Sequence, residues 1–226
     1  TVEVGTTRNL VIPLIKKLKN FLPGKDYSIS FAPERTVEGN ALKELKLIPQ
    51  IIGGFSENCT KKSLSFWNKI SNSTITVANL ESAELIKLAN NTFRDLSFAF
   101  SNELGLICSK FNIDAHELIK SANSGYIRNP IPKPSPGVGG YCLSKDPLIY
   151  SRIAKKYLIK NDLGQAARNI NKKTINSIIL LIKNYSKHIN KKLSKINILI
   201  VGVAFKGLPE TNDTRSSSAL HIKDLL

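Results

Sequence analysis

The stretch NLESAELIKLANNTFRDLSFAFSNELGLICSKFN, residues 79–112, decides the fold that this sequence predicts. Its apolar side chains recur at helical spacing, at Leu85, Leu88, Leu96, Phe100, Leu104, Ile107 and Phe111. About 30 residues of helix, at 1.5 Å per residue, would measure about 45 Å, which is longer than the interior of a small domain. We therefore expect a helix that links two domains or packs against a second subunit.

The residues before this helix alternate between strand and helix patterns. The predicted strands are residues 1–5, 27–33, 50–54 and 73–78, and the predicted helices are residues 8–22, 41–50 and 59–71. The first helix would begin at a cap formed by Thr6 or Thr7 and end at Pro23-Gly24. Strands that alternate with short helices indicate βαβ units and a parallel sheet.

The residues after the long helix are mostly helical until a second α/β pattern begins. Helices are predicted at 114–123, with Asp114 as N-cap, at 145–158 and at 163–189, with a Pro/Gly-rich loop at 129–140. A β-branched run at 195–207 is predicted to be a strand, and 216–226 a helix. The predicted fold class is therefore α/β. We expect a partial Rossmann-like parallel sheet in residues 1–80, an all-α central domain in 81–193 and the start of a second Rossmann-like domain in 194–226.

The chain has 226 residues and a formal net charge of +16. A basic surface suits nucleic acid or a nucleotide-type anion, but it also follows from a composition rich in lysine, asparagine and isoleucine. The sequence has no helix-turn-helix, zinc or aromatic RNA-binding signature, which argues against a nucleic-acid-binding protein. No run approaches the roughly 18–20 apolar residues that a membrane span needs, and residues 1–5 do not resemble a signal peptide.

Three cysteines are present, Cys59, Cys108 and Cys142, without CxxC spacing. This small, odd number favours a reducing, cytoplasmic setting over a disulfide framework. The three histidines show no ligand spacing, so no metal site is predicted. The chain has no methionine and its first residues resemble the end of a strand, so we expect a piece of a longer protein.

The segment PGVGGYCLSKDP, residues 136–147, places Cys142 in a predicted loop behind two glycines. Most free cysteines are small buried hydrophobic residues, and that interpretation stands for Cys59 and Cys108, which lie in helical patterns. For Cys142 a nucleophilic role is the alternative. Gly139 and Gly140 leave room for a ligand or another backbone, and the charge of Lys145 would favour a thiolate.

Polar residues follow the long predicted helix beside its apolar stripe, among them Glu84, Lys87, Asn91, Asp95 and Asn102. They suit either a solvated face or a site. Lys87 and Asn91 are four residues apart and share a face, where an amine and an amide could stabilise an oxyanion.

Other charged residues lie where α/β proteins bind ligands. Glu34 and Glu38 follow a predicted strand, although acidic residues are also common in the first turn of a helix. Lys206 and Arg215 suit phosphate contacts. The G-x-G-x-x-G fingerprint does not occur in this chain.

These segments together resemble the UDP-glucose/GDP-mannose dehydrogenase family over essentially all residues of the chain. Five motifs carry the resemblance, in the family's order: TVEVGTT, APERTVEGNALKEL…IIGG, ESAELIKLANNTFRDLSFAFSNEL, PGVGGYCLSKDP and VGVAFKG…NDTRSSSALHI. PERTVEGNA and NNTFRDLSFAFSNEL are most similar to the branch that oxidises UDP-N-acetylmannosamine or UDP-N-acetylglucosamine.

The resemblance implies that the C6 alcohol of a UDP-sugar is oxidised to a carboxylate with two NAD⁺ as hydride acceptors. Cys142 would attack the intermediate aldehyde, and Lys87 with Asn91 would stabilise the oxyanion. Asp146 would be the acid/base partner, and Glu38 with Thr1 would lie near the water and the cofactor.

The implied cofactor contacts also include Lys145 and Arg215. The implied substrate contacts are Lys87, Asn91, Arg128 (lent across a dimer), Gly139, Gly140, Tyr141 and Lys206.

The resemblance also assigns roles to the predicted domains. Residues 1–80 would bind NAD, 81–193 would form a homodimer and carry catalysis, and 194–226 would begin the UDP-sugar-binding domain. Because the glycine-rich fingerprint does not occur in this chain, most of the family's NAD site is not encoded in it. The alternative is therefore a catalytically incomplete dimerisation fragment of such an enzyme.

Overall fold

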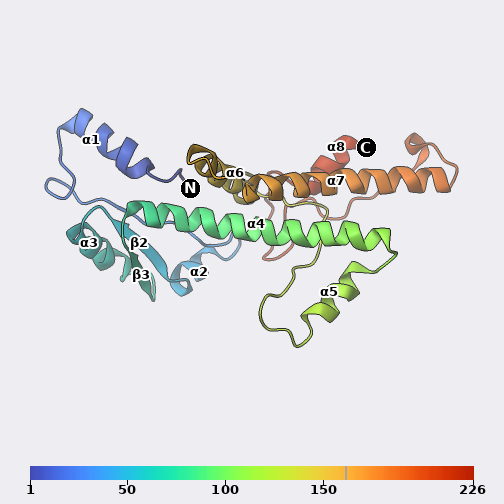
Figure 1. Cartoon of the computed structure of the whole chain (residues 1–226), viewed down its shortest axis with the longest axis horizontal. Helices are drawn as coiled ribbons and strands as arrows, with labels where there is room; N and C mark the ends of the chain where they lie inside the picture. Colours follow the sequence, from blue (N-terminus) through green and yellow to red (C-terminus); the bar gives the residue numbers. More distant parts are fainter. Residues whose placement is uncertain (161) are drawn as a thin grey trace. The chain divides into compact units, whose positions relative to one another are not determined.

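The computed structural model describes residues 1–160 and 162–226 (Figure 1). These residues form two units, Thr1–Asn90 and Asn91–Leu226. The elements of the first unit are η1 (Thr7–Val11), α1 (Ile12–Lys19), β1 (Ser30–Phe31), α2 (Ala41–Leu47), β2 (Gln50–Gly54), α3 (Glu57–Trp67) and β3 (Thr74–Val77). Helix α4 (Leu80–Lys110) begins in the first unit and ends in the second. The second unit continues with α5 (Ala115–Asn123), α6 (Tyr141–Lys156), α7 (Leu163–His188), η2 (Leu193–Lys195) and α8 (Ser218–Leu225).

The sheet of the first unit has the strand order β1-β2-β3. Strand β2 is buried at every position and pairs in parallel with β3, with Ile51 opposite Ile75. Helix α3 connects these two strands and packs against all three, so β2-α3-β3 is the predicted βαβ unit. The predicted α/β class is thereby confirmed.

The prediction of a wholly parallel sheet is wrong at β1. Strand β1 is antiparallel to β2, with Ser30 opposite Gly54 and Phe31 opposite Gly53. A parallel pair needs a crossover helix that packs on the sheet, and α3 supplies one only between β2 and β3. The β-rich run 27–33 was sufficient to predict a strand but contained no information on the direction of that strand.

The N-terminal segment also differs from the prediction. Among the residues that the structure describes, 1–5 belong to no strand. The first helix starts as the π-helical turn η1, and neither threonine caps it as predicted: the Thr6 hydroxyl donates to the carbonyl of Glu3, and the Thr7 hydroxyl donates to Glu84. Helix α1 ends at Lys19, before Pro23, because Asn20 adopts the left-handed conformation (φ 56°) that terminates helices.

Helix α4 confirms the long helix that the sequence predicts, with 31 residues. Its first turn is capped by Asn79, whose side-chain oxygen accepts from the backbone N–H and the hydroxyl of Ser82. One face of the helix is buried, at Leu80, Ala83, Leu88, Ala99 and Cys108. Several members of the predicted apolar stripe are exposed, including Phe100, Ile107 and Phe111.

The second unit is built from helices around an isoleucine cluster. Helix α7 packs against α6 and α8, and Ile175, Ile179 and Ile222 form the buried core. The predicted helices are confirmed, and Asp114 caps α5 by accepting from the backbone of His116 and Glu117.

The predicted strand at 195–207 does not form in the described part of the chain. A strand requires a neighbouring strand for its backbone groups, and residues 196–201 pair with none in the described part of the chain. Leu199 and Val201 are 86% and 87% exposed. The helix predicted after it is present as α8, with Ser217 as N-cap.

No helix within residues 1–160 and 162–226 has the length and apolar character that a membrane span needs.

Candidate active site

Gly139 and Gly140 lie at a close crossing of two backbone segments in the second unit. A Cβ atom at Gly139 would stand 2.3 Å from the carbonyl oxygen of Ser216, and one at Gly140 would stand 2.7 Å from the ring of Phe205. Gly140 also has φ +83° and donates its N–H to the carbonyl of Arg215. The two glycines therefore leave room for the 205–216 segment. Of the two explanations given above, a ligand or another backbone nearby, the structure shows the second.

Cys142 lies in the first turn of α6 and is exposed to solvent. The sequence predicted a loop there and a helix from 145, but α6 begins at Tyr141 immediately after the left-handed Gly140. The first turn of a helix carries unpaired N–H groups and the positive end of the helix dipole, which stabilise negative charge. The buried positions predicted for Cys59 and Cys108 are confirmed.

Asn91 and Asp146 are brought together from α4 and α6. The Asn91 amide donates to the Asp146 carboxylate at 2.6 Å, and the Lys145 ammonium pairs with the other carboxylate oxygen. Asp146 is fully buried. Three of the predicted site residues thus share one hydrogen-bonded group one turn of helix after Cys142.

A basic and aromatic surface adjoins the start of α6. The Lys145 ammonium lies 5.1 Å and the Arg215 guanidinium 5.3 Å from the centroid of the Tyr141 ring. Arg215 is oriented by hydrogen bonds from its Nε and Nη2 to the carboxylate of Asp213. Lys206 lies over the ring of Phe205, which in turn contacts Gly140. Cations arranged around an aromatic ring suit a ligand that carries phosphates.

In the first unit, Lys87 is buried and its ammonium donates to the backbone carbonyl of Glu34. The same ammonium lies 3.6 Å from the Glu34 carboxylate. Partial burial disfavours ionisation of Glu34, but hydrogen bonds from Thr36 and the Lys87 charge outweigh it and hold the pKa of Glu34 below its usual value. The segment APERTVEG is therefore tied to α4 by Lys87.

The loop that carries Glu34 and Glu38 has its own supports. The Val37 N–H donates to the Glu44 carboxylate at 2.7 Å, and the Gln50 amide donates to the carbonyl of Pro33 at 3.0 Å. Glu38 itself is exposed.

Two further predicted residues lie on the surface. Thr1 is exposed at the first position of the chain, and Arg128 is exposed with its guanidinium 5.4 Å from the centroid of the Tyr126 ring.

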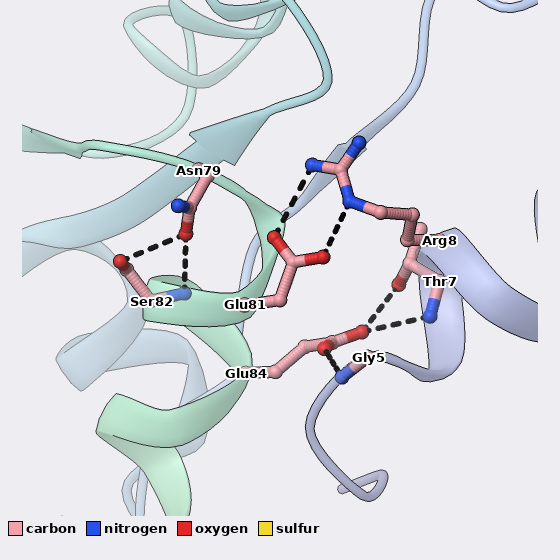
Figure 2. Close-up of polar contacts among 7 residues, drawn as sticks. All are labelled: Gly5, Thr7, Arg8, Asn79, Glu81, Ser82 and Glu84. Atoms are coloured by element: carbon pink, nitrogen blue, oxygen red, sulfur yellow. Dashed lines mark hydrogen bonds and ion pairs between the residues drawn. The ribbon is translucent and has the colours of Figure 1, made fainter.

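Glu84 has a role that the sequence did not reveal. Its carboxylate accepts from the backbone N–H of Gly5 at 2.6 Å and from the N–H and hydroxyl of Thr7 at 2.9 and 2.6 Å (Figure 2). Beside it, the Arg8 guanidinium pairs with Glu81 at 2.5 Å (Figure 2). Glu84 is 1% exposed, so it clamps the TVEVGTT segment to α4 from within the protein.

The polar residues along α4 are therefore not a solvated face. Glu84, Lys87, Asp95 and Asn102 are all buried. Their partners lie far away in the sequence. The carboxylate of Glu84 accepts from Gly5 and Thr7, and the carboxylate of Asp95 accepts from Asn171 at 2.8 Å and pairs with Arg168 at 3.2 Å. Asn171 and Arg168 were not singled out from sequence, since nothing local to α7 marks them as buried.

Burial raises the pKa of Asp95 from 3.8 to about 6, although Arg168 and Asn171 favour the ionised form. Between about pH 3.8 and 6 the unfolded chain loses the Asp95 proton while the folded protein keeps it, so the free energy of unfolding falls as the pH rises and levels off above about 6. The total fall corresponds to about 3 kcal/mol at 1.36 kcal/mol per pKa unit. In urea unfolding, the stability of the wild type minus that of Asp95→Asn should fall by this amount between pH 3 and 7. A difference that stays constant over this range would contradict the shift.

No three His, Cys, Asp or Glu side chains within residues 1–160 and 162–226 lie close enough together to hold a metal ion.

Two stretches of the chain match domains of one known family. Residues 1–71 match the NAD-binding domain of the UDP-glucose/GDP-mannose dehydrogenase family, and residues 81–173 match its central domain. The UDP-N-acetyl-D-mannosamine dehydrogenase of Pyrococcus horikoshii is 34% identical over 228 residues, which covers 100% of this chain and 52% of the relative. The corresponding Escherichia coli K12 protein is 33% identical, covering 89% of this chain and 47% of the relative.

Solved structures agree with the sequence comparison. The structure of UDP-D-ManNAc dehydrogenase from Pyrococcus horikoshii matches with a TM-score of 0.91 at 33% identity, covering 100% of this chain and 52% of that one. The NDP-N-acetyl-D-galactosaminuronic acid dehydrogenase of Methanosarcina mazei matches with a TM-score of 0.85 at 26% identity, covering 100% and 49%. The chain thus spans about half the length of the relatives it matches. The predicted resemblance is confirmed, and the chain belongs to the UDP-glucose/GDP-mannose dehydrogenase family.

Proposed function

We propose that the protein is an NAD-dependent nucleotide-sugar 6-dehydrogenase that oxidises the C6 alcohol of a UDP-sugar, UDP-N-acetylmannosamine, to the uronate. The observation that carries the proposal is the exposed thiol of Cys142 in the first turn of α6, one turn before the buried Asp146 and its partner Asn91. The similarity to UDP-N-acetyl-D-mannosamine dehydrogenases supports this choice of substrate.

Residues near the start of α6 suit the diphosphate of a dinucleotide. Lys145 and Arg215 place two cations around the Tyr141 ring, a donor set that matches a diphosphate. We assign Lys145 and Arg215 to cofactor binding, with Thr1 and Glu38 near the cofactor and the water. When bound, NAD⁺ supplies the hydride acceptor for both oxidation steps.

Cys142 holds the sugar covalently between these steps. The thiolate adds to the C6 aldehyde, and the resulting thiohemiacetal loses hydride from C6 to become a thioester. Water then cleaves the thioester, which releases the carboxylate and regenerates the thiol. A covalent tether is needed because a free aldehyde would otherwise hydrate or leave the site.

Lys87 and Asn91 are assigned to the oxyanion that forms at C6. They lie one helical turn apart in α4, so an ammonium and an amide project from the same face. In comparable sites, the loss of one such donor costs about 3–4 kcal/mol of transition-state stabilisation. Asp146 is assigned as the acid/base partner, since its carboxylate is held by Asn91 and Lys145.

The remaining substrate contacts are assigned by the family's pattern. They are Arg128, Gly139, Gly140, Tyr141 and Lys206. We likewise assign residues 1–80 to NAD binding, 81–193 to dimerisation and catalysis, and 194–226 to the start of the UDP-sugar-binding domain.

A homodimer through the central helical region is part of this proposal. Phe93, Phe100 and Ile107 recur at seven-residue spacing on α4 and are 71%, 55% and 49% exposed. Such a stripe on one face of a long helix is the pattern that a second helix covers. We also propose a cytoplasmic location, in keeping with three free cysteines and a nucleotide-sugar substrate.

The test is the stoichiometry of NADH formed per sugar by the protein that contains this chain, over a panel of UDP-sugars. We expect two NADH per sugar and the highest rate with UDP-N-acetylmannosamine. One NADH per sugar with accumulating aldehyde would contradict the covalent scheme. A protein that dimerises but reduces no NAD⁺ with any sugar would favour the catalytically incomplete dimerisation module instead.

A further inference from the structure

We propose that Arg168 is a positioning residue that holds the start of α6, and with it the Cys142 thiol, in the reactive geometry. This inference rests on the proposed nucleophilic role of Cys142. Arg168 lies in α7, is 5% exposed, and directs its guanidinium at the segment that carries the two glycines and the cysteine.

The first contact follows from Pro147, which lies inside α6. A proline has no N–H, so the carbonyl four residues earlier has no partner within the helix. That carbonyl belongs to Leu143, directly after Cys142. The Nη1 of Arg168 donates to it at 2.7 Å, which satisfies the backbone group that the proline leaves without a helical partner.

The second contact lies on the other side of the cysteine. The Nη2 of Arg168 donates to the carbonyl of Val138 at 3.2 Å, just before Gly139. The planar guanidinium therefore joins the last residue before the glycine pair to the first residue after Cys142. Gly140 has a left-handed φ of +83°, and glycine can adopt many backbone conformations. Holding the backbone on both sides of the turn reduces the number of conformations that it can adopt.

The guanidinium is itself anchored in the core. Its Nη1 lies 3.2 Å from the carboxylate of Asp95, which is fully buried in α4. The Asn171 amide donates to the same carboxylate at 2.8 Å, and Asn102 donates to the carbonyl oxygen of the Asn171 side chain at 2.9 Å. The Asn102 side chain also accepts from the backbone N–H of Ser135 at 2.7 Å, upstream of the glycine turn.

A buried ion pair is not in itself a sign of stabilisation, because desolvating both charges offsets most of their attraction. The contacts of this pair indicate instead that it orients the backbone around Cys142. Arg168 and Asn102 together fix the backbone at Ser135, Val138 and Leu143, three points along one short segment. Arginine suits this task because its fork of donors reaches several acceptors at once, whereas the ammonium of lysine is a single point charge.

The experiment compares Arg168→Lys with the wild type and with Arg152→Lys, a matched control at an exposed arginine of α6. Lysine keeps a positive charge for Asp95 but cannot span both carbonyls. We expect kcat for acid formation to fall on the order of 30-fold, since small misplacements of reacting groups can cost 10²-fold. The KM for NAD⁺ should stay within twofold, because the cations assigned to the cofactor are unchanged. Arg152→Lys should match the wild type in both.

A second readout follows the thiol directly in the 226-residue chain. The rate constant for carbamidomethylation of Cys142 by iodoacetamide, measured by mass spectrometry, should fall at least about fivefold in Arg168→Lys. The same rate in Arg152→Lys should not change.

The outcomes separate this inference from the proposed function. If Cys142→Ser is inactive while Arg168→Lys keeps the wild-type kcat and alkylation rate, the positioning role is wrong and the function stands. If Arg168→Lys merely reduces the yield of folded protein, with unchanged kcat per active site, its role is structural and the inference is also overturned. If Cys142→Ser forms acid normally, the proposed function itself fails.

Discussion

Replacing Cys142 with serine is expected to lower the rate of acid formation by on the order of 10⁴-fold, because a serine hydroxyl is almost entirely un-ionised at neutral pH and is a far weaker nucleophile than a thiolate. A loss of this size corresponds to about 5–6 kcal/mol of transition-state free energy. The side chains are nearly equal in volume and Cys142 is exposed, so the folded structure should not change. The chemistry alone should account for the loss.

The variant should still carry out the first hydride transfer, since no sulfur takes part in oxidation of the alcohol to the aldehyde. We therefore expect up to one NADH per sugar, with no acid, in place of the two of the wild type. Cys108→Ala is the control, because Cys108 is buried in α4 and is given no chemical role. Acid formation by Cys142→Ser within tenfold of the wild type would remove the covalent step from the scheme.

The elements that the sequence predicted correctly are those specified by local patterns. The 31 residues of α4 follow from helical periodicity, and α5 follows from its cap at Asp114. Strand β2 follows from a short apolar run ended by glycines, and all five of its residues are buried. In each case the segment itself contains the information.

The errors arise where a segment depends on partners elsewhere in the chain. The β-branched run at 195–207 has strand propensity, but a ladder needs a second strand, and residues 196–201 pair with none in the described part of the chain. The direction of β1 is likewise set by its pairing with Gly53 and Gly54, which its own sequence does not encode.

Cys142 shows how a local signal can mislead. The glycine pair Gly139-Gly140 indicates a loop by ordinary rules, and the predicted helix starts only at residue 145, yet α6 begins at Tyr141. Gly140 has a left-handed φ immediately before α6, and the Leu143 carbonyl, which Pro147 leaves without a helical partner, accepts from Arg168, 25 residues away. A sequence pattern cannot show that a distant arginine makes an interior proline tolerable.

For the candidate site, the sequence pointed to residues that the structure brings together: Asn91, Lys145 and Asp146 share one hydrogen-bonded group. Their chemical roles stay predictions. The burial of Glu84 and Asp95 was not predictable, since a carboxylate on a helix is ordinarily solvated and only its distant partners make burial possible.

Glu84→Ala is expected to lower the free energy of unfolding by about 4 kcal/mol, measured by urea denaturation at pH 7. The substitution removes the acceptor of three hydrogen bonds, two from backbone N–H groups and one from the Thr7 hydroxyl, in a site where Glu84 is 1% exposed. Hydrogen bonds to a charged group contribute about 1.5–3 kcal/mol each, and buried donors left without a partner are costly. Water that enters the space would recover part of the loss, so the total lies below the simple sum.

The matched control is Glu81→Ala, one turn earlier on the same helix and bound to the adjacent Arg8 (Figure 2). The side chains of Arg8 and Glu81 are 40% and 28% exposed, so their ion pair should contribute less than about 1 kcal/mol. Glu84→Gln should fall between the two, because its single carbonyl oxygen can serve Thr7 but not Gly5 as well. If Glu84→Ala cost no more than Glu81→Ala, the clamp on the TVEVGTT segment would have no energetic weight, and the first residues of the chain would need another anchor to α4.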